Sequence, residues 1–348
     1  MAPVIRRLEA DPQIQSRIVA TAQHREMLDV VVDRFELRID RDLDVMNADQ
    51  QLAQLTARLL RRLDPVLEEE GPDLVLAQGD TSTVVCAALA CFYRGIRFGH
   101  VEAGLRTHDL AFPFPEELNR VLVGRLATDH FAPTAGARDN LLAEGADPAR
   151  IEVTGNTVID AVLGAAAMDV PLDIPLDPGA RLILVTAHRR EGFGAPMRSA
   201  LGALRELVDR YRDLQLVYPV HPNPNVRAIV GQVLAGHPRI LLCEPLDYFG
   251  FVQLMARSYF IVTDSGGIQE EAPALGKPVL VLRAKTERPE AVAEGVVELV
   301  GMDPECILAS ATRLLDDAEA YGTMARGVSP YGDGRAAERI HAAIRRQL

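Results

Sequence analysis

The chain contains no tryptophan, and aromatic residues account for only 5% of its 348 residues. Cysteine is also scarce, and the cysteines form neither a Cys-x-x-Cys pair nor the spacing of a zinc site. Most of them lie in apolar runs, which is typical of buried thiols in a reducing compartment. The sequence therefore predicts a cytoplasmic protein without a metal site; the cysteines are Cys86, Cys91, Cys243 and Cys306.

Long apolar runs are absent as well. No segment reaches the roughly 18 apolar residues that a membrane-spanning helix needs. Residues 1–20 are interrupted by Arg6, Arg7, Glu9 and Asp11, so they do not resemble a signal peptide. A formal net charge of −12 disfavours nucleic acids and anionic membranes as partners, because both are negatively charged. An anionic ligand therefore requires a local cluster of cationic side chains.

Short apolar segments recur through the chain and are separated by segments in which apolar residues have helical spacing. Residues 50–70 show this spacing clearly, and Gly71-Pro72 ends that helix. Such alternation of strands and helices is typical of doubly wound parallel sheets. We therefore predict an α/β fold with strands near 16–21, 73–80, 96–101, 130–132, 151–155, 181–186, 214–219, 240–243, 260–263 and 278–281. The strand at 73–80 is expected to be buried and to end in polar residues.

Length and a shift in composition predict two domains. The 348 residues exceed the size of one average domain, and residues 168–180 are rich in proline and aspartate, as linkers are. The alternation of strands and helices restarts after this segment. We predict two Rossmann-like domains, covering residues 1–168 and 169–334, and a final helix at about 335–348.

Polar clusters follow four of the predicted strands. Ligands bind outside the carboxyl ends of strands in open parallel sheets, so these clusters are candidate sites. The clusters of the first half present acids, whereas those of the second half present cations. This asymmetry predicts a crevice with reacting carboxylates on one wall and an anion on the other; the clusters are 78–81, 100–106, 186–191 and 221–225.

The segment 260–272 passes from an apolar strand through Ser265-Gly266-Gly267 into a predicted helix. A helix N-terminus offers unpaired N–H groups and a positive dipole, and glycine lets an oxyanion approach the backbone closely. One interpretation is a phosphate-binding turn, with Glu270 or Glu271 accepting hydrogen bonds from ribose hydroxyls. The alternative is an ordinary helix start with acidic residues in its first turn.

Several of the candidate side chains also have a purely structural interpretation. Asp80 stands where a helix N-cap is expected, and Glu116 and Glu117 stand where acids complement a helix dipole. Arg120 is spaced for a routine surface ion pair with either glutamate. His221, between valine and proline, has the surroundings of a core histidine. The residue pattern leaves both interpretations open.

A series of motifs in a fixed order resembles the non-hydrolysing UDP-N-acetylglucosamine 2-epimerases, bacterial enzymes with a glycosyltransferase-B-like fold. The resemblance extends from Met1 to the C-terminal helix. The long motifs make it specific; they lie at 23–27, 79–81, 100–106, 115–120, 155–160, 188–191, 218–224, 264–271, 286–290 and 330–334.

The resemblance implies an isomerase that interconverts UDP-N-acetylglucosamine and UDP-N-acetylmannosamine, in a cleft between the two domains and without metal or other cofactor. UDP is eliminated to leave a 2-acetamidoglucal and is then added back, which inverts carbon 2. The product supplies cell-surface polysaccharide synthesis. The catalytic positions implied by the motifs are Asp80, Glu102, Glu116 and His188.

The resemblance also implies substrate contacts, a regulatory site and a homodimer. A second UDP-N-acetylglucosamine activates some members of the family, and the matching positions here are Gln23, Arg189 and His221. The final helix crosses back to the first domain in this fold. The substrate contacts are expected at Arg120, Ser265, Gly266, Gly267 and Glu271.

Members of this family begin with a strand and a Gly-Thr-Arg-Pro-Glu turn, before the helix at which this chain starts. The resemblance therefore implies that the first domain lacks its first strand and an arginine that contacts the UDP phosphates. A start placed too late is the favoured explanation, since every later motif is intact. The alternative is a damaged product that binds UDP-sugars without turnover.

Two other enzyme classes share a nucleotide-diphosphate site of this kind: a glycosyltransferase of the same fold, and a hydrolysing epimerase. The acids at 80, 102 and 116 favour epimerisation, because glycosyl transfer does not need three carboxylates around carbon 2.

Overall fold

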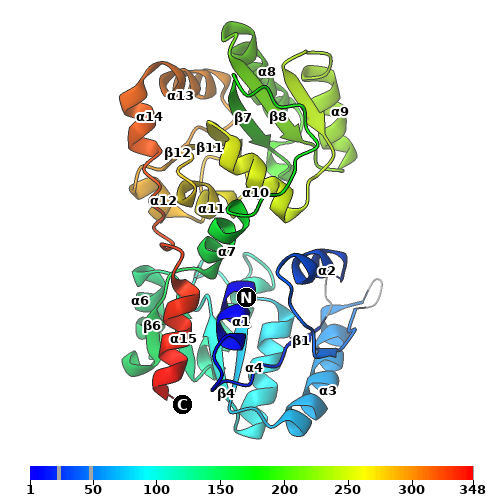
Figure 1. The fold of residues 1–348 in the computed structure, drawn as a ribbon, viewed down its shortest axis with the longest axis vertical. Coiled ribbons are helices and arrows are strands. Elements are labelled where there is room, and N and C mark those ends of the chain that lie inside the picture. The colour runs from blue at the N-terminus through cyan, green and yellow to red at the C-terminus, as the bar shows by residue number, and fades with distance from the viewer. Residues whose placement is uncertain (22–24, 47–49, 348) are drawn as a thin grey trace. The chain divides into compact units, whose positions relative to one another are not determined.

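The computed structural model describes residues 1–21, 25–46 and 50–347. The chain divides into two compact units (Figure 1). Unit 1 consists of Met1–Ala161 with Tyr331–Leu348, and unit 2 is Val162–Pro330. Among the described residues, the structure contains no helix that is both long and apolar enough to cross a membrane.

Unit 1 is built on a sheet of four parallel strands that follow one another in chain order, β3-β4-β5-β6. Two very short parallel strands, β1 and β2, pair separately. The bounds are β1 (Val19–Ala20), β2 (Arg41–Asp42), β3 (Leu74–Gln78), β4 (Arg97–Val101), β5 (Asp129–Ala132) and β6 (Ile151–Val153).

Helices alternate with these strands in unit 1. They are α1 (Ala2–Glu9), α2 (Arg25–Arg34), α3 (Leu52–Glu70), α4 (Ser82–Arg94), α5 (Glu116–Leu126), α6 (Ala135–Ala143), α7 (Thr157–Ala166, which spans the division) and α15 (Ala336–Gln347), with a 3-10 turn at Pro148–Arg150.

Helix α3 shows how spacing in the sequence produces the core of unit 1. Its leucines recur every four residues, so they form one stripe, and that stripe is buried against α4. The helix ends where Gly71 adopts a left-handed conformation with φ +51°, which glycine tolerates without strain. The buried residues of the stripe are Leu55, Leu59, Leu63 and Leu67.

The last helix, α15, packs beside the first helix, α1, within unit 1 (Figure 1). Ile340 and Ile344 of α15 share a buried cluster with Val4 and Leu8 of α1. The carboxylate of Asp160 accepts the backbone N–H groups of residues 336 and 337, at 3.1 and 2.9 Å, and so caps α15. The two ends of the described chain therefore belong to one core.

Unit 2 contains a sheet of six parallel strands in the order β12-β11-β10-β7-β8-β9. If the six strands are numbered 1 to 6 along the chain and the sheet is read from β9 to β12, the order is 3-2-1-4-5-6, which is that of a Rossmann fold. The direction of strand addition changes between β7 and β10. The bounds are β7 (Arg181–Thr186), β8 (Leu214–Pro219), β9 (Ile240–Cys243), β10 (Phe260–Thr263), β11 (Val279–Val281) and β12 (Val297–Leu299).

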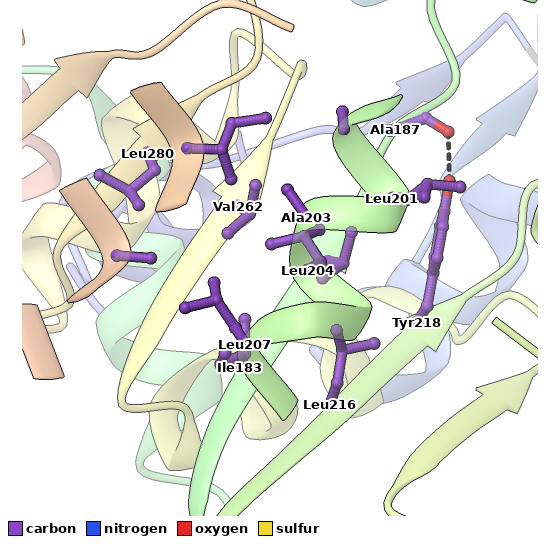
Figure 2. Close-up of a cluster of buried hydrophobic side chains, with 14 of the residues drawn as sticks. Ile183, Ala187, Leu201, Ala203, Leu204, Leu207, Leu216, Tyr218, Val262 and Leu280 are labelled. Atoms are coloured by element: carbon purple, nitrogen blue, oxygen red, sulfur yellow. Dashed lines mark hydrogen bonds between the residues drawn. The ribbon is translucent and has the colours of Figure 1, made fainter. Parts of the chain in front are cut away.

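The core of unit 2 lies between this sheet and its helices. Figure 2 shows Leu201, Leu204 and Leu207 of α8 in one buried cluster with Ile183 of β7 and Val262 of β10. The helices are α8 (Ala195–Arg210), α9 (Pro224–Val233), α10 (Tyr248–Arg257), α11 (Ile268–Ala274), α12 (Pro289–Ala293), α13 (Pro304–Asp316) and α14 (Ala318–Met324), with a 3-10 turn at Arg190–Gly192.

The predicted α/β class with parallel sheets is confirmed, and β7, β8, β9 and β10 have the predicted bounds. Two strand predictions need correction. The strand expected at 16–21 is only Val19–Ala20, because its single partner β2 has just two residues. The strand at 74–78 was expected to be buried, yet all five residues are partly exposed, because β3 is an edge strand of its sheet.

Candidate functional site

The neighbouring strands β7 and β10 mark the switch point of the unit 2 sheet. Ligands of open α/β sheets bind at such a point, outside the carboxyl ends of the strands. The two strand ends are joined there by a hydrogen bond between Thr186 Oγ1 and Thr263 Oγ1, which are 2.6 Å apart. The residues that follow these threonines are therefore the first candidates for a ligand site in unit 2.

Asp264 follows β10 and is completely buried. Its Oδ2 accepts the backbone N–H groups of His188 and Arg189, at 2.7 and 2.8 Å, which ties the loop after β7 to the loop after β10. Its Oδ1 lies 3.5 Å from Nδ1 of His188. The predicted diphosphate contact, His188, is thus held by the buried carboxylate of Asp264, for which the sequence pattern indicates no role.

The imidazole of His188 is 40% exposed and stacks on His221, with ring centroids 5.1 Å apart and planes 10° from parallel. Burial lowers the pKa of His188 below its usual value; Asp264 opposes this shift, whereas His221 and Arg189 add to it. The predicted positions His188, Arg189 and His221 therefore come together. The fourth, Gln23, lies outside the described residues.

His221 is exposed, so its interpretation as a core histidine is wrong. It follows β8, and its Nδ1 accepts the backbone N–H of Asn223 at 3.1 Å. The strand ends of β7 and β8 thus present two stacked imidazoles on one side of the switch point.

The Ser265–Gly267 turn follows Asp264 directly. Neither Gly266 nor Gly267 has a positive φ, and a Cβ placed on either would meet no heavy atom within 4 Å. Neither backbone N–H donates a hydrogen bond to another group of the described chain. Because neither packing nor backbone conformation requires glycine here, these positions leave open space and free donors for an anion.

The two glutamates of α11 have different surroundings. Glu270 is buried and its Oε1 accepts a hydrogen bond from Nε of Arg288. Burial and the neighbouring charge of Glu270 raise the pKa of Glu271 to about 7, and the Tyr248 hydroxyl opposes this shift. The structure therefore separates a glutamate in an ion pair with Arg288 from a buried glutamate beside the Tyr248 hydroxyl, and the resemblance selects the second for the ribose.

In unit 1, Asp80 follows β3 and belongs to an ion-pair network with α5. Its Oδ2 accepts hydrogen bonds from Nε and Nη2 of Arg120, at 3.0 and 2.7 Å. Arg120 also contacts Glu117, which is completely buried and accepts the N–H groups of Thr107 and His108 at 2.9 and 3.0 Å.

This network excludes two purely structural interpretations, that of Asp80 as a helix N-cap and that of Arg120 as a member of a surface ion pair. Asp80 is not the N-cap of α4, because that position is Thr81. The ion pair between Glu117 and Arg120 has the predicted spacing of three residues, but it is not a surface pair, since the side chain of Glu117 is only 1% exposed. Arg120 instead holds Asp80 in place from α5.

Glu102 follows β4 and has φ +66°, a conformation that glutamate rarely adopts. Its carboxylate accepts a hydrogen bond from Gln78 Nε2 at 3.2 Å, and Asn156 Nδ2 lies 3.5 Å from its other oxygen. Backbone strain of this kind persists where surrounding contacts fix it, most often at functional sites. The strained residue is thus one of the predicted acids.

The turns that carry Asp80 and Glu102 are adjacent. Gly79 donates its N–H to Val101 at 3.1 Å, and a Cβ on Gly79 would lie 3.9 Å from a carboxylate oxygen of Glu102. His100 Nε2 lies 2.8 Å from the Gly79 carbonyl, and burial lowers the pKa of His100 to about 4, so its ring is neutral. Gly79 itself has φ +86°, which requires glycine.

The third predicted acid, Glu116, lies in the first turn of α5, one residue before Glu117. The turns of Asp80 and Glu102 therefore lie together at the carboxyl edge of the unit 1 sheet, and Arg120 connects α5, the helix that begins with Glu116, to Asp80. The sequence prediction did not identify Glu117 or His100 as the groups that hold this edge together.

The sequence profile of the family described as UDP-N-acetylglucosamine 2-epimerase matches residues 6–345. The chain belongs to this family. It is 51% identical to UDP-N-acetylglucosamine 2-epimerase of Yersinia pestis and 48% identical to that of Escherichia coli K12; each alignment covers 99% of this chain and 94% of the relative.

Solved structures are also similar to this chain. The structure from Neisseria meningitidis bound to UDP-GlcNAc is 44% identical, with a TM-score of 0.87, and the match covers 99% of this chain and 96% of that one. S. aureus MnaA with UDP is 46% identical, with a TM-score of 0.86, and the match covers 100% and 93%. A glycosyltransferase of kitacinnamycin, 15% identical with a TM-score of 0.62 over 98% and 94%, shares the fold alone.

These similarities confirm the predicted family, the glycosyltransferase-B-like fold and the enzyme class, an isomerase.

Proposed function

We propose that the chain binds UDP-N-acetylglucosamine and converts it reversibly into UDP-N-acetylmannosamine by eliminating UDP and adding it back. One observation carries the proposal: the switch point of unit 2 presents a glycine turn with open space and free N–H groups beside His188. It is supported by the family relatives, one of which was solved bound to UDP-GlcNAc.

The chemistry explains why a phosphate site and several acids are needed. Carbon 2 of the sugar is not next to a carbonyl, so a base cannot remove its proton directly. If the proton leaves while the bond from carbon 1 to the UDP oxygen breaks, the C–H electrons form a C1=C2 double bond. The electrons of the broken bond stay on the β-phosphate. The products are 2-acetamidoglucal and UDP.

The reverse step completes the epimerisation. An acid protonates carbon 2 on the opposite face while the UDP oxygen adds to carbon 1. Groups that stabilise the diphosphate lower the barrier in both directions, and positioned carboxylates carry the proton. UDP is both leaving group and nucleophile, so the reaction uses no cofactor and consumes nothing.

We assign diphosphate binding to unit 2. The N–H groups of Gly266 and Gly267 donate to the phosphate oxygens, with Ser265 and His188 as further contacts. Glu271 accepts the ribose hydroxyls, because its neighbour Glu270 already binds Arg288. These assignments explain why glycine occupies two positions that the protein's own packing leaves open.

We assign proton transfer to the carboxylates of unit 1, namely Asp80, Glu102 and Glu116. Arg120 is the positioning group of Asp80, which it contacts through two nitrogens. Gln78 and Asn156 hold a second carboxylate, that of Glu102, at the neighbouring strand end. These carboxylates supply a base for one face of carbon 2 and an acid for the other.

One experiment separates this reaction from its rivals. The chain is incubated with UDP-N-acetylglucosamine in heavy water, and carbon 2 is followed by proton NMR. We expect deuterium at carbon 2 of both epimers, with UDP-sugar conserved. Net release of N-acetylmannosamine would indicate the hydrolysing reaction, and sugar transfer would indicate a glycosyltransferase. Binding of UDP-sugar without exchange would indicate a chain that has lost catalysis.

We further propose that Arg189 and His221 contact a second, activating UDP-N-acetylglucosamine, that the chain forms a homodimer, and that its product supplies cell-surface polysaccharide. The resemblance supports these three points. The first is tested by the dependence of the initial rate on substrate concentration: sigmoidal in the native chain and hyperbolic in His221→Ala. Light scattering tests the homodimer.

A further inference from the structure

We propose that Asp264 is the positioning residue of His188: its buried carboxylate fixes the imidazole with Nδ1 facing inward, so that Nε2 is left to meet the diphosphate. The inference rests on the proposed function, which assigns the diphosphate to this switch point.

The two carboxylate oxygens of Asp264 are in different situations. Oδ2 is satisfied by two backbone N–H groups, those of His188 and Arg189. Oδ1 is completely buried and makes no hydrogen bond within the described chain, but Nδ1 of His188 lies 3.5 Å away. A buried carboxylate oxygen without a donor is costly. A proton on Nδ1 of His188 supplies the donor that faces it.

The backbone of His188 is held on both sides, which fixes the point from which the ring projects. Its N–H is bound by Asp264 at 2.7 Å. The preceding carbonyl, of Ala187, accepts a hydrogen bond from the hydroxyl of Tyr218, which lies 1% exposed in the core (Figure 2). The face of the ring is covered by His221. The edge that carries Nε2 is opposite to the edge that faces Asp264.

This orientation determines which nitrogen carries the proton. With a proton on Nδ1, the neutral ring presents a lone pair at Nε2, and Nε2 gains a proton only when the ring becomes an imidazolium. The titratable and charged groups that face His188 are Asp264 after β10, His221 after β8 and the adjacent Arg189. Burial, His221 and Arg189 all favour the neutral ring in the free protein.

A bound diphosphate reverses that balance, because its negative charge stabilises the imidazolium. UDP binding is therefore accompanied by proton uptake from solvent at Nε2 of His188. Asp264 stabilises the same charged form through Nδ1. The role resembles that of the aspartate which orients the histidine of a serine-protease triad, an arrangement recognised by its geometry on unrelated folds.

The first test reads the tautomer directly in the native chain. The protein, labelled with 15N-histidine, is studied by NMR with and without UDP, and His188→Gln identifies the resonances of His188. We expect a proton on Nδ1 without UDP and protons on both nitrogens with it. A neutral ring protonated on Nε2 would overturn the inference. No turnover is needed, so this result is distinguishable from failure of the proposed epimerisation.

The second test uses Asp264→Asn. The amide oxygen can still accept the two backbone N–H groups, but the side chain no longer stabilises an imidazolium. We expect a roughly 10- to 100-fold lower kcat, the scale known for partners that orient metal-bound imidazoles, with a changed pH profile and less than about threefold change in KM. Calorimetry in two buffers of different ionisation enthalpy should show that proton uptake on UDP binding is lost.

The matched control is Asp303→Asn in the same unit. Asp303 likewise accepts two backbone N–H groups, those of Glu305 and Cys306, at the start of α13. We expect this control to leave kcat and proton uptake unchanged. In a His188→Gln background, Asp264→Asn should lower kcat no further. An undiminished loss in that background would show that Asp264 does not act through His188. If Asp264→Asn does not fold, the tautomer measurement decides alone.

Discussion

Replacing Glu271 by glutamine should stabilise the chain at high pH while weakening UDP binding. The folded structure raises the pKa of this carboxyl from 4.5 to about 7, chiefly by burial and secondarily through Glu270. Between these two values the folded chain holds a proton that the unfolded chain has lost. Stability therefore falls as pH rises through this window, and the full cost of the charge is present above pH 7.

The magnitude follows from the shift. At about 1.4 kcal/mol per pKa unit, a rise from 4.5 to about 7 corresponds to roughly 3 kcal/mol of destabilisation at pH 8. Most of this cost is absent at pH 5. Glutamine has nearly the same shape and no charge, so Glu271→Gln should have a higher free energy of unfolding than the native chain. This advantage should be about 2 to 3 kcal/mol larger at pH 8 than at pH 5.

The assay is urea unfolding of both chains at the two pH values, with UDP affinity measured by calorimetry at pH 8. The neighbouring variant Glu270→Gln is the matched control and should have the opposite sign. It breaks a buried pair with Arg288, which typically costs about 3 to 5 kcal/mol. A Glu271→Gln chain that is no more stable at pH 8 than the native chain would refute the reasoning.

Three further predictions follow from the geometry. Gly266→Ala should fold normally, because the space is open and φ is not positive, yet calorimetry should show at least about tenfold weaker UDP binding; the control Gly202→Ala, also in open space, should bind UDP normally. Asp80→Asn and Glu102→Gln should each retain UDP binding and lose deuterium exchange at carbon 2; native exchange rates would remove that residue from the mechanism. Leu59→Ala should lower the free energy of unfolding by about 2 to 5 kcal/mol in urea titrations, since Leu59 is completely buried.

Much of the fold could be predicted because its signals are local. The strand at Arg181–Thr186 is an apolar run that ends at polar residues, and the helix at Leu52–Glu70 is marked by its leucine spacing and Gly71. The edge position of β3 could not be predicted, because it depends on which strands pair.

Part of the site could also be predicted, because some of its residues lie in local sequence motifs. The motifs indicated His188 and the Ser265–Gly267 turn, but the role of Asp264 depends on two strand ends brought together from 76 residues apart. A sequence also does not show which of two adjacent acids forms a buried ion pair. In the pair Glu116 and Glu117, it is Glu117 that pairs with Arg120; in the pair Glu270 and Glu271, it is Glu270 that pairs with Arg288. Only the packing of α5 and α11 distinguishes the members of each pair.

The central claim is that the bond between carbon 1 and UDP breaks during epimerisation. It is tested most directly with UDP-N-acetylglucosamine carrying 18O in the bridge between carbon 1 and the β-phosphorus. The account predicts that the chain moves 18O into the non-bridging β-phosphate positions while deuterium from heavy water enters carbon 2. Deuterium exchange with the 18O still wholly in the bridge would contradict it.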